Sequence, residues 1–262
     1  MIIDEEPSLP ELEGYLSPET IPNLYLIYDA RRELGKRARF RAAVGPGGVE
    51  GVSLLYRGNP YTSVWILGTE RAAEGLLEGE PVQRVIVCTQ PPLAGLVESR
   101  LPGHRRYEVD VMAARRPLTA RLPTGGVRRL SADDAYQWAT LRADPADGGP
   151  SAKEVEEAAK LLQENVAFGL YEDGSLVSRA LSHVRMPEGW GVSGVFTRQD
   201  RRGRGYASSV VSALAEAAFR ETDSVMLFVR SDNAAAKRAY QKVGFSTVAN
   251  RVFCDVGVGW SP

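Results

Sequence analysis

A stretch rich in arginine and glycine, placed directly before an apolar segment, is the part of this sequence that most clearly suggests ligand chemistry. It reads RRGRGYA over residues 201–207, and apolar side chains follow at helical spacing at Val210, Leu214 and Ala217. The first turn of a helix leaves backbone N–H groups unpaired and carries partial positive charge, and glycine lets a phosphate approach the backbone closely. The stretch therefore predicts a site for a phosphate-bearing ligand at a helix start.

Two well-known phosphate-binding loops fit this stretch poorly. The P-loop requires Lys and then Ser or Thr after its glycines, and the dinucleotide fingerprint requires a third glycine or an alanine where this chain has Ser208. Taken alone, the stretch is equally compatible with a solvated basic turn before a surface helix. The motifs that surround it are therefore needed to choose between these interpretations.

The composition indicates a globular protein without a global charge that would recruit polyanions. Of the 262 residues 44% are hydrophobic and 25% are charged, with a net charge of -1. No apolar run approaches the ~20 residues of a membrane span. The N-terminus is acidic where a signal peptide would be basic, and Cys88 and Cys254 match neither a disulfide framework nor a metal-ligand spacing. We expect a cytoplasmic protein that binds no nucleic acid, membrane or metal.

A basic cluster in the first half could in principle contact nucleic acid. It consists of Lys36, Arg37, Arg39 and Arg41. Because the chain has so little net charge, a solvated turn or strand face is the favoured interpretation. The same reasoning disfavours nucleic-acid binding through the RQDRRGR segment, since its charge is confined to one loop.

Linker residues divide the chain into two parts. Pro, Gly and Thr interrupt the periodic segments at 118–126, which predicts one domain over 1–117 and another over 127–262. Strand and helix patterns alternate in both parts, so the fold class is α/β (α+β). In the second part, turn signals at 173–174 and 187–189 predict an antiparallel meander. Helix, strand, helix and strand follow it.

The order of motifs in the second part resembles the GNAT superfamily of acyl-CoA-dependent N-acyltransferases. The pattern Arg202-x-x-Gly205-x-Ala207 follows a strand that reads GVFT. Beyond it, SVMLFVRSDNAAAKRAYQKVGF contains N-x-x-A-x-x-x-Y-x-x-x-G-F. The resemblance spans roughly residues 127–256 and implies a GNAT fold, with a central mixed, mostly antiparallel sheet flanked by helices.

The first part resembles the N-terminal half of glycine N-acyltransferase-like proteins. The resemblance rests on RGNP at residues 57–60 and on the rhythm of strands and helices. It implies a degenerate copy of the same fold that binds no cofactor. The alternative is an unrelated α/β accessory domain.

The GNAT resemblance implies that the chain binds acetyl-CoA or another acyl-CoA as co-substrate. The diphosphate would lie on the loop backbone and the pantetheine alongside the preceding strand. Tyr240 would act as general acid toward the departing thiolate, and it shares one helix face with Asn233 and Ala236. Alternatively, Asn233 only caps the helix and Tyr240 is a half-buried aromatic residue. The implied cofactor-binding residues are Val195, Phe196, Thr197, Arg202, Gly203, Arg204, Gly205, Tyr206, Ala207, Asn233 and Ala236.

The general base is not evident from the sequence. Similar family members carry a carboxylate at the position that matches Gly191, and the segment 189–196 contains none. His183 could accept a proton near neutral pH, and Ser193 could orient a water molecule that relays it. Both also fit ordinary strand residues. Glu188 lies in a turn and is expected to be too peripheral.

Together these features predict an N-acetyltransferase. It would move an acetyl or short acyl group from acyl-CoA to a primary amine of a small molecule or peptide, by direct attack in a ternary complex. Because the strand carboxylate is missing, a non-catalytic acyl-CoA sensor is the alternative. The sequence leaves the amine acceptor and the oligomeric state open.

Overall fold

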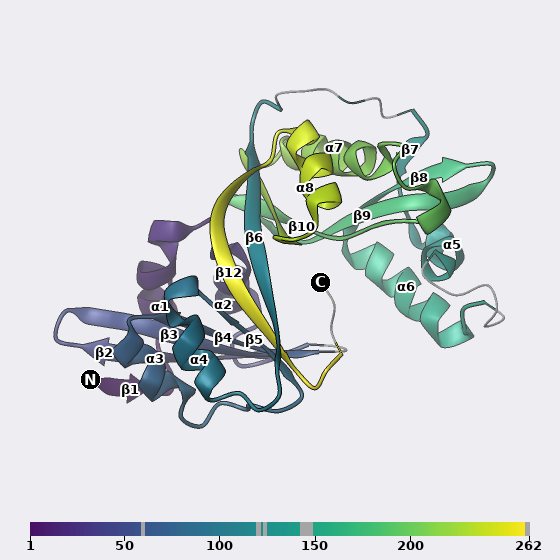
Figure 1. The fold of residues 1–262 in the computed structure, drawn as a ribbon. Coiled ribbons are helices and arrows are strands. Elements are labelled where there is room, and N and C mark those ends of the chain that lie inside the picture. The colour runs from purple at the N-terminus through teal and green to yellow at the C-terminus, as the bar shows by residue number, and fades with distance from the viewer. Residues whose placement is uncertain (59–60, 119–121, 123–124, 142–148, 260–262) are drawn as a thin grey trace. The chain divides into compact units, whose positions relative to one another are not determined.

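The computed structural model describes residues 1–58, 61–118, 122, 125–141 and 149–259, and its elements are labelled in Figure 1. The chain forms two compact units. Unit 1 contains Met1–Val111, Val229–Asp232 and Thr247–Pro262, and unit 2 contains Met112–Phe228 and Asn233–Ser246.

The first unit contains two N-terminal helices, a three-stranded meander and further helices and strands. Its sheet has the order β1-β2-β3-β4-β5-β12-β6, in which β4 and β5 are parallel. Residues of α3, α4, β4, β5 and β12 share one buried apolar core. Its elements are β1 (Ile2–Asp4), α1 (Leu9–Leu16), α2 (Leu24–Arg32), β2 (Ala38–Gly45), β3 (Gly48–Arg57), β4 (Thr62–Gly68), α3 (Glu70–Leu77), β5 (Val85–Thr89), α4 (Ala94–Ser99) and β6 (Arg105–Arg115).

The second unit has the same kinds of element in a similar order. Its sheet runs β6-β11-β10-β9-β8-β7, with β10 and β11 parallel and β7 to β10 antiparallel. The two turns expected in its meander occur where β8 meets β9 and where β9 meets β10. Its elements are β7 (Val127–Arg129), α5 (Ala135–Thr140), α6 (Ala152–Glu164), β8 (Val166–Glu172), β9 (Ser175–Met186), β10 (Gly189–Thr197), α7 (Tyr206–Ala218), β11 (Ser224–Arg230) and α8 (Ala234–Val243). The last strand, β12 (Ser246–Val256), begins at the end of unit 2 and belongs to unit 1 from Thr247 onward.

The two units repeat one chain order. The series α1-α2-β2-β3-β4-α3-β5-α4-β6 corresponds element by element to α5-α6-β8-β9-β10-α7-β11-α8-β12. The fold class predicted from the sequence, including a second copy in the N-terminal half, is therefore confirmed. Asn59 and Pro60 of the RGNP motif lie outside the described residues.

The last strand of each copy is exchanged, which the sequence did not indicate. β12 pairs antiparallel with β5, so that Val252 lies opposite Thr89 and Val256 opposite Val85. β6 in turn lies beside β11. The C-terminal strand therefore belongs mainly to unit 1, whereas the sequence predicted a single boundary at 118–126. Positions 119–121 and 123–124 of that predicted linker lie outside the described residues.

Trp65, Trp138 and Cys88 lie in the core. The two tryptophans are 8% and 6% exposed. Cys88 is a buried free thiol, and burial raises its pKa well above the ordinary value. None of the helices in the described part of the chain is long and apolar enough to cross a membrane.

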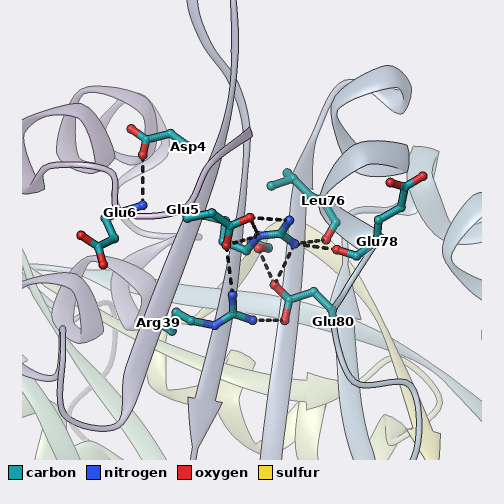
Figure 2. Close-up of polar contacts among 9 residues, drawn as sticks. Asp4, Glu5, Glu6, Arg39, Leu76, Glu78 and Glu80 are labelled. Carbon is teal, nitrogen blue, oxygen red and sulfur yellow. Dashed lines mark hydrogen bonds and ion pairs between the residues drawn. The ribbon is translucent and has the colours of Figure 1, made fainter. Parts of the chain in front are cut away.

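The basic cluster of the first half is not a solvated face at Arg41, which is buried. Figure 2 shows its partners Glu5, Leu76, Glu78 and Glu80 together with Arg39. Its Nη1 donates to the carbonyl oxygens of Leu76 and Glu78, at 2.9 and 2.8 Å. Its Nε donates to the Glu5 carboxylate at 2.9 Å. The guanidinium therefore satisfies the carbonyl groups at the end of α3, where cations are favoured.

The buried carboxylate of Glu80 completes this network. Its side chain is only 1% exposed and accepts hydrogen bonds from Ser53 Oγ at 2.9 Å and Arg39 Nη2 at 3.0 Å. An ion pair at 3.5 Å joins it to Arg41. A buried charge is tolerated only when it is paired and hydrogen-bonded. Arg41 and Glu80 therefore depend on each other.

We predict that Arg41→Ala destabilises unit 1 by ~3–5 kcal/mol, because it leaves the carbonyl oxygens of Leu76 and Glu78 without this donor and removes one of the cations that pair with the buried Glu80. Arg39 is the matched control, since its side chain is 39% exposed and its loss leaves Glu80 paired with Arg41. Arg39→Ala should cost about 1 kcal/mol or less. Urea unfolding followed by circular dichroism measures both. Equal losses of stability in the two variants would contradict the prediction.

Candidate functional site

The helix α7 starts in a way that leaves its first amides available. Gly205 is its N-cap residue, with φ 84° and no side-chain hydrogen bond to the first turn, and that turn has no acidic residue. Gly203 also has a positive φ, of 80°. A side chain at either glycine would meet no atom within 4 Å, so the glycines serve the backbone conformation and leave space above it. This geometry supports the anion site expected from the sequence.

Most arginines of this loop are already paired with carboxylates. Glu172, at the end of β8, lies 2.6 Å from Arg201 Nε and 3.4 Å from Arg204 Nη1. It also accepts the Tyr206 hydroxyl at 2.7 Å. The Tyr206 hydrogen bond, together with the two arginines, lowers the pKa of Glu172. Glu172 therefore neutralises part of the positive charge of the loop while it fixes the loop conformation.

Arg202 has a different kind of partner. Its Nε donates to the Thr197 carbonyl oxygen at 3.1 Å, and its guanidinium lies 5.9 Å from the centre of the Phe196 ring. The side chain is exposed. Three residues predicted to bind the cofactor are thus brought together where β10 leads into the loop.

The parallel pair of β10 and β11 ends early. Trp190 lies opposite Val225, and the pairing stops at Val192 opposite Leu227, while β10 continues to Thr197. Between Ser193 and Phe196 the pairing of β10 with β9 shifts register, and Gly194 has φ 59°. This is a β-bulge, which bends a strand and releases backbone groups from the ladder. Val195, Phe196 and Thr197 lie in the part of β10 that has left β11.

The structure places the candidate base, His183, beside Ser193, the residue that could orient a water molecule. His183 Nδ1 lies 3.2 Å from Ser193 Oγ. A second register shift skips His183, because Gly191 pairs with Val184 and Val192 pairs with Ser182. His183 is solvent-exposed, yet partial loss of water around its ring lowers its pKa. An imidazole with a lowered pKa is neutral at neutral pH and can accept a proton.

The position where a carboxylate was missing is closed to solvent. Gly191 is buried and lies between Val184 of β9 and Met226 of β11. Glu188 lies in the turn between β9 and β10, at the end of β10 opposite the bulge. The sequence-based view that Glu188 is peripheral agrees with this placement.

The helix α8 contains the remaining predicted residues. Asn233 Oδ1 accepts from the Ala236 backbone N–H at 3.1 Å, so Asn233 does cap the helix. Capping uses only the Oδ1 acceptor and does not require the amide hydrogens. Gly244, with φ 108°, ends the helix as expected.

Tyr240 is buried on α8, a helix that packs against α7. Its side chain is 7% exposed, and burial raises its pKa to about 12. Next to it, the Ala239 carbonyl oxygen accepts from Ser208 Oγ of α7 at 3.0 Å. The Tyr240 hydroxyl therefore stays protonated at neutral pH, as a general acid must.

The equivalent position in unit 1 is closed. The Thr69 side chain accepts from the Ala72 backbone N–H at 3.2 Å, and Glu70 lies in the first turn of α3. At the end of β5, Thr89 Oγ1 donates to the Ile66 carbonyl oxygen at 2.8 Å. Gln90 Nε2 donates to the Gly68 carbonyl oxygen, also at 2.8 Å, so the ends of β4 and β5 are held together. The start of α3 is therefore poorly suited to a phosphate, because it is capped by a side chain and carries an acidic residue.

One group of potential metal ligands occurs in the described part of unit 1. Glu98, His104 and Cys254 offer atoms within 4.8 Å of one another. Arg106 Nη1 is paired with Glu98 at 2.6 Å, which places a cation beside the group. Burial raises the pKa of Cys254 to about 12, which disfavours the thiolate that a metal would need. We assign no metal to this group.

Sequence reasoning missed three residues that position the site. Glu172 organises the loop, Ser208 ties α7 to α8, and Asp200 pairs with Arg198 Nε at 2.7 Å. Nothing in the sequence marks Glu172, because its partners come about thirty positions later.

Comparisons with known proteins agree with the fold. Residues 132–245 match the Acetyltransferase (GNAT) family. A structure from Drosophila covers 96% of this chain and 95% of its own, with TM-score 0.68 and 14% identity. A GCN5-related N-acetyltransferase from Sphaerobacter thermophilus covers 97% and 94%, with TM-score 0.60 and 16% identity. No curated protein matches the sequence.

A structure described as a tandem GNAT protein from the clavulanic acid biosynthesis pathway bears on the repeat. It is similar over 100% of both chains, with TM-score 0.58 and 15% identity. At such identities the similarity shows the fold alone, and it matches the duplicated element order of this chain. Residues 132–245 therefore form a domain of the acetyltransferase (GNAT) family, within a chain that has a tandem GNAT fold.

Proposed function

We propose that this protein is an N-acetyltransferase that moves an acetyl or short acyl group from acyl-CoA to a primary amine. The observation that carries the proposal is the uncapped start of α7 beside the bulged end of β10. An anion can approach the Gly203 and Gly205 backbone there, and an extended arm can lie along Val195–Thr197. Family membership supports acyl transfer, and the closed equivalent position in unit 1 supports a single site per chain.

In the proposed reaction the amine nitrogen attacks the thioester carbonyl carbon, so that a C–N bond forms and the C–S bond breaks. Backbone N–H groups near Phe196 or Thr197 stabilise the developing oxyanion. Tyr240 gives its proton to the departing thiolate. His183 accepts the amine proton, directly or through a water molecule held by Ser193.

A non-catalytic acyl-CoA sensor is the second candidate. The specific observation in its favour is the buried Gly191 where a catalytic carboxylate would stand. Thiol release from acetyl-CoA, measured over a panel of amines, separates the two functions. A sensor binds coenzyme A without releasing thiol in the presence of any amine. The cytoplasmic location stays a prediction from the sequence, and the sequence leaves the identity of the amine acceptor and the oligomeric state open.

We predict that Gly205→Asp weakens coenzyme A binding by ~5- to 30-fold relative to Gly205→Asn, because it adds repulsion of ~1–2 kcal/mol toward the diphosphate. Both side chains tolerate the left-handed conformation and both cap helices, so only the charge differs. Isothermal titration calorimetry measures the affinities. Equal affinity in the two folded variants would place the diphosphate elsewhere.

We predict that Tyr240→Phe lowers kcat by at least ~10-fold, and up to the ~10²- to 10⁴-fold typical of general acid catalysis. Its affinity for coenzyme A should change little, because the ring is kept. Since the pKa of Tyr240 is about 12, wild-type kcat should show no loss from its ionisation below about pH 10. Tyr206→Phe is the control, because its hydroxyl binds Glu172 and should affect affinity rather than kcat. Unchanged kcat in Tyr240→Phe, with single-turnover kinetics showing that chemistry is rate-limiting, would exclude this role.

We predict that His183→Gln lowers kcat/KM by ~10²-fold and removes the acidic limb of its pH profile. In the wild type this limb should lie below the ordinary histidine value of about 6.5, because the pKa of His183 is lowered by loss of water around the ring. Ser193→Ala should keep the limb and lose less activity. An acidic limb that is the same in His183→Gln and wild type would assign the base to another group.

A further inference from the structure

We propose that unit 2 contains a second small-molecule site, a pocket beneath the C-terminal half of α7 that binds a zwitterionic amphiphile of the aromatic α-amino acid class. This proposal is independent of the acyltransferase function, because it concerns different residues and is tested by direct binding.

The pocket lies between α7 and the sheet of unit 2. Its volume is about 460 Å³, which lies within the range of small-molecule sites. The helix packs across β7, β8, β9 and β10. The lining residues are Val127, Arg129, Val166, Phe168, Arg185, Trp190, Ala213, Glu216, Ala217, Arg220 and Glu221.

The floor of the pocket is apolar and partly aromatic. Trp190 is buried, and Phe168 is half-buried on the neighbouring part of the sheet. On the helix side, Ala213 and Ala217 stand one turn apart and are half-buried, so their small side chains leave room below α7. Such a floor suits a flat ring, which gains by burial and by contact with other aromatic rings.

Charged side chains surround this floor without neutralising one another. Glu216 and Arg220 are four residues apart, a spacing at which ion pairs are common. Within the described part of the chain, however, neither has an ion-pair partner, and the same is true of Arg129 and Glu221. The Arg185 guanidinium lies 5.7 Å from the Trp190 ring, and its hydrogen bond to the Glu164 carbonyl oxygen is long, at 3.5 Å.

The charged side chains around the pocket floor, which we call the rim, differ from the arginines of the loop before α7. There, Arg198, Arg201 and Arg204 each have a carboxylate partner. At the pocket, by contrast, both signs of charge are present and none is paired with the other. A ligand with a carboxylate and an ammonium group can therefore complement arginine and glutamate at once.

The pocket is distinct from the proposed coenzyme A site. Ala213 is seven residues beyond Tyr206, which places it ~10 Å further along the helix. Both sites nevertheless use α7 and β10. The floor and the mixed rim together favour a ring that carries an α-amino acid group over a simple fatty acid or a phosphate ester.

Calorimetric titration with three matched probes tests the proposal. L-phenylalanine carries both charges, 3-phenylpropionate lacks the ammonium group, and phenethylamine lacks the carboxylate. We expect phenylalanine to bind with Kd of ~1 mM or tighter, and each analogue to bind more weakly. The double variant Arg185→Ala/Arg220→Ala should weaken phenylalanine binding by at least ~10-fold, as the loss of charge-assisted hydrogen bonds predicts. Ala217→Leu, which fills the floor, should weaken it as well.

Arg100→Ala is the matched control, because Arg100 is also an exposed arginine just beyond a helix end. It should bind phenylalanine like the wild type. Circular dichroism checks that each variant is folded. Absence of binding by phenylalanine, equal binding of all three probes, or unchanged affinity in both pocket variants would overturn the proposal. Loss of phenylalanine binding when coenzyme A is saturating would also overturn it, because the ligand would then occupy the acyl-transfer site.

Discussion

The early end of the β10–β11 pairing is the constraint on which the proposed site depends. Parallel strands that stayed paired to their ends would leave no space for an extended arm between them. The bulge at Gly194 turns β10 away after Val192, and the strand then leads into a loop whose two glycines have positive φ. The start of α7 consequently faces open space with its first amides uncapped. Backbone geometry, rather than any one reactive side chain, therefore makes this position suitable for a ligand.

The corresponding helix starts of the two units differ by only a few side-chain hydrogen bonds. Both have a helix that follows one strand of a parallel pair. In unit 1, Thr69 caps α3, and Thr89 and Gln90 hold the strand ends together. In unit 2, Gly205 replaces the capping side chain. A few side-chain hydrogen bonds thus determine whether a helix dipole is satisfied within the protein or left for a ligand.

Ion pairs have different roles in the two units. In unit 1, the buried Arg41 and Glu80 are part of the packing, so the loss of one removes a hydrogen-bonding partner from groups that are closed to water. In unit 2, Glu172 pairs with the half-buried Arg201 and the exposed Arg204, and it accepts a hydrogen bond from Tyr206. We interpret Glu172 as a positioning group. It neutralises part of the positive charge of the loop and thereby fixes the loop conformation. The pocket beneath α7 differs from both, because its charges are not paired within the described residues.

The sequence by itself determined the features that depend on neighbours along the chain. Glycines with positive φ, turn residues, capping residues and apolar periodicity predicted the meander, the start of α7, and the cap and end of α8. Motif spacing indicated the family. Only the tertiary structure decided the exchange of β6 and β12, the pairing of Glu172 with residues of the α7 loop, and the contact between His183 and Ser193. These features depend on strand register and on side chains that meet across the sheet. A shift of one residue in register would separate His183 from Ser193, and no local pattern in the sequence records that register.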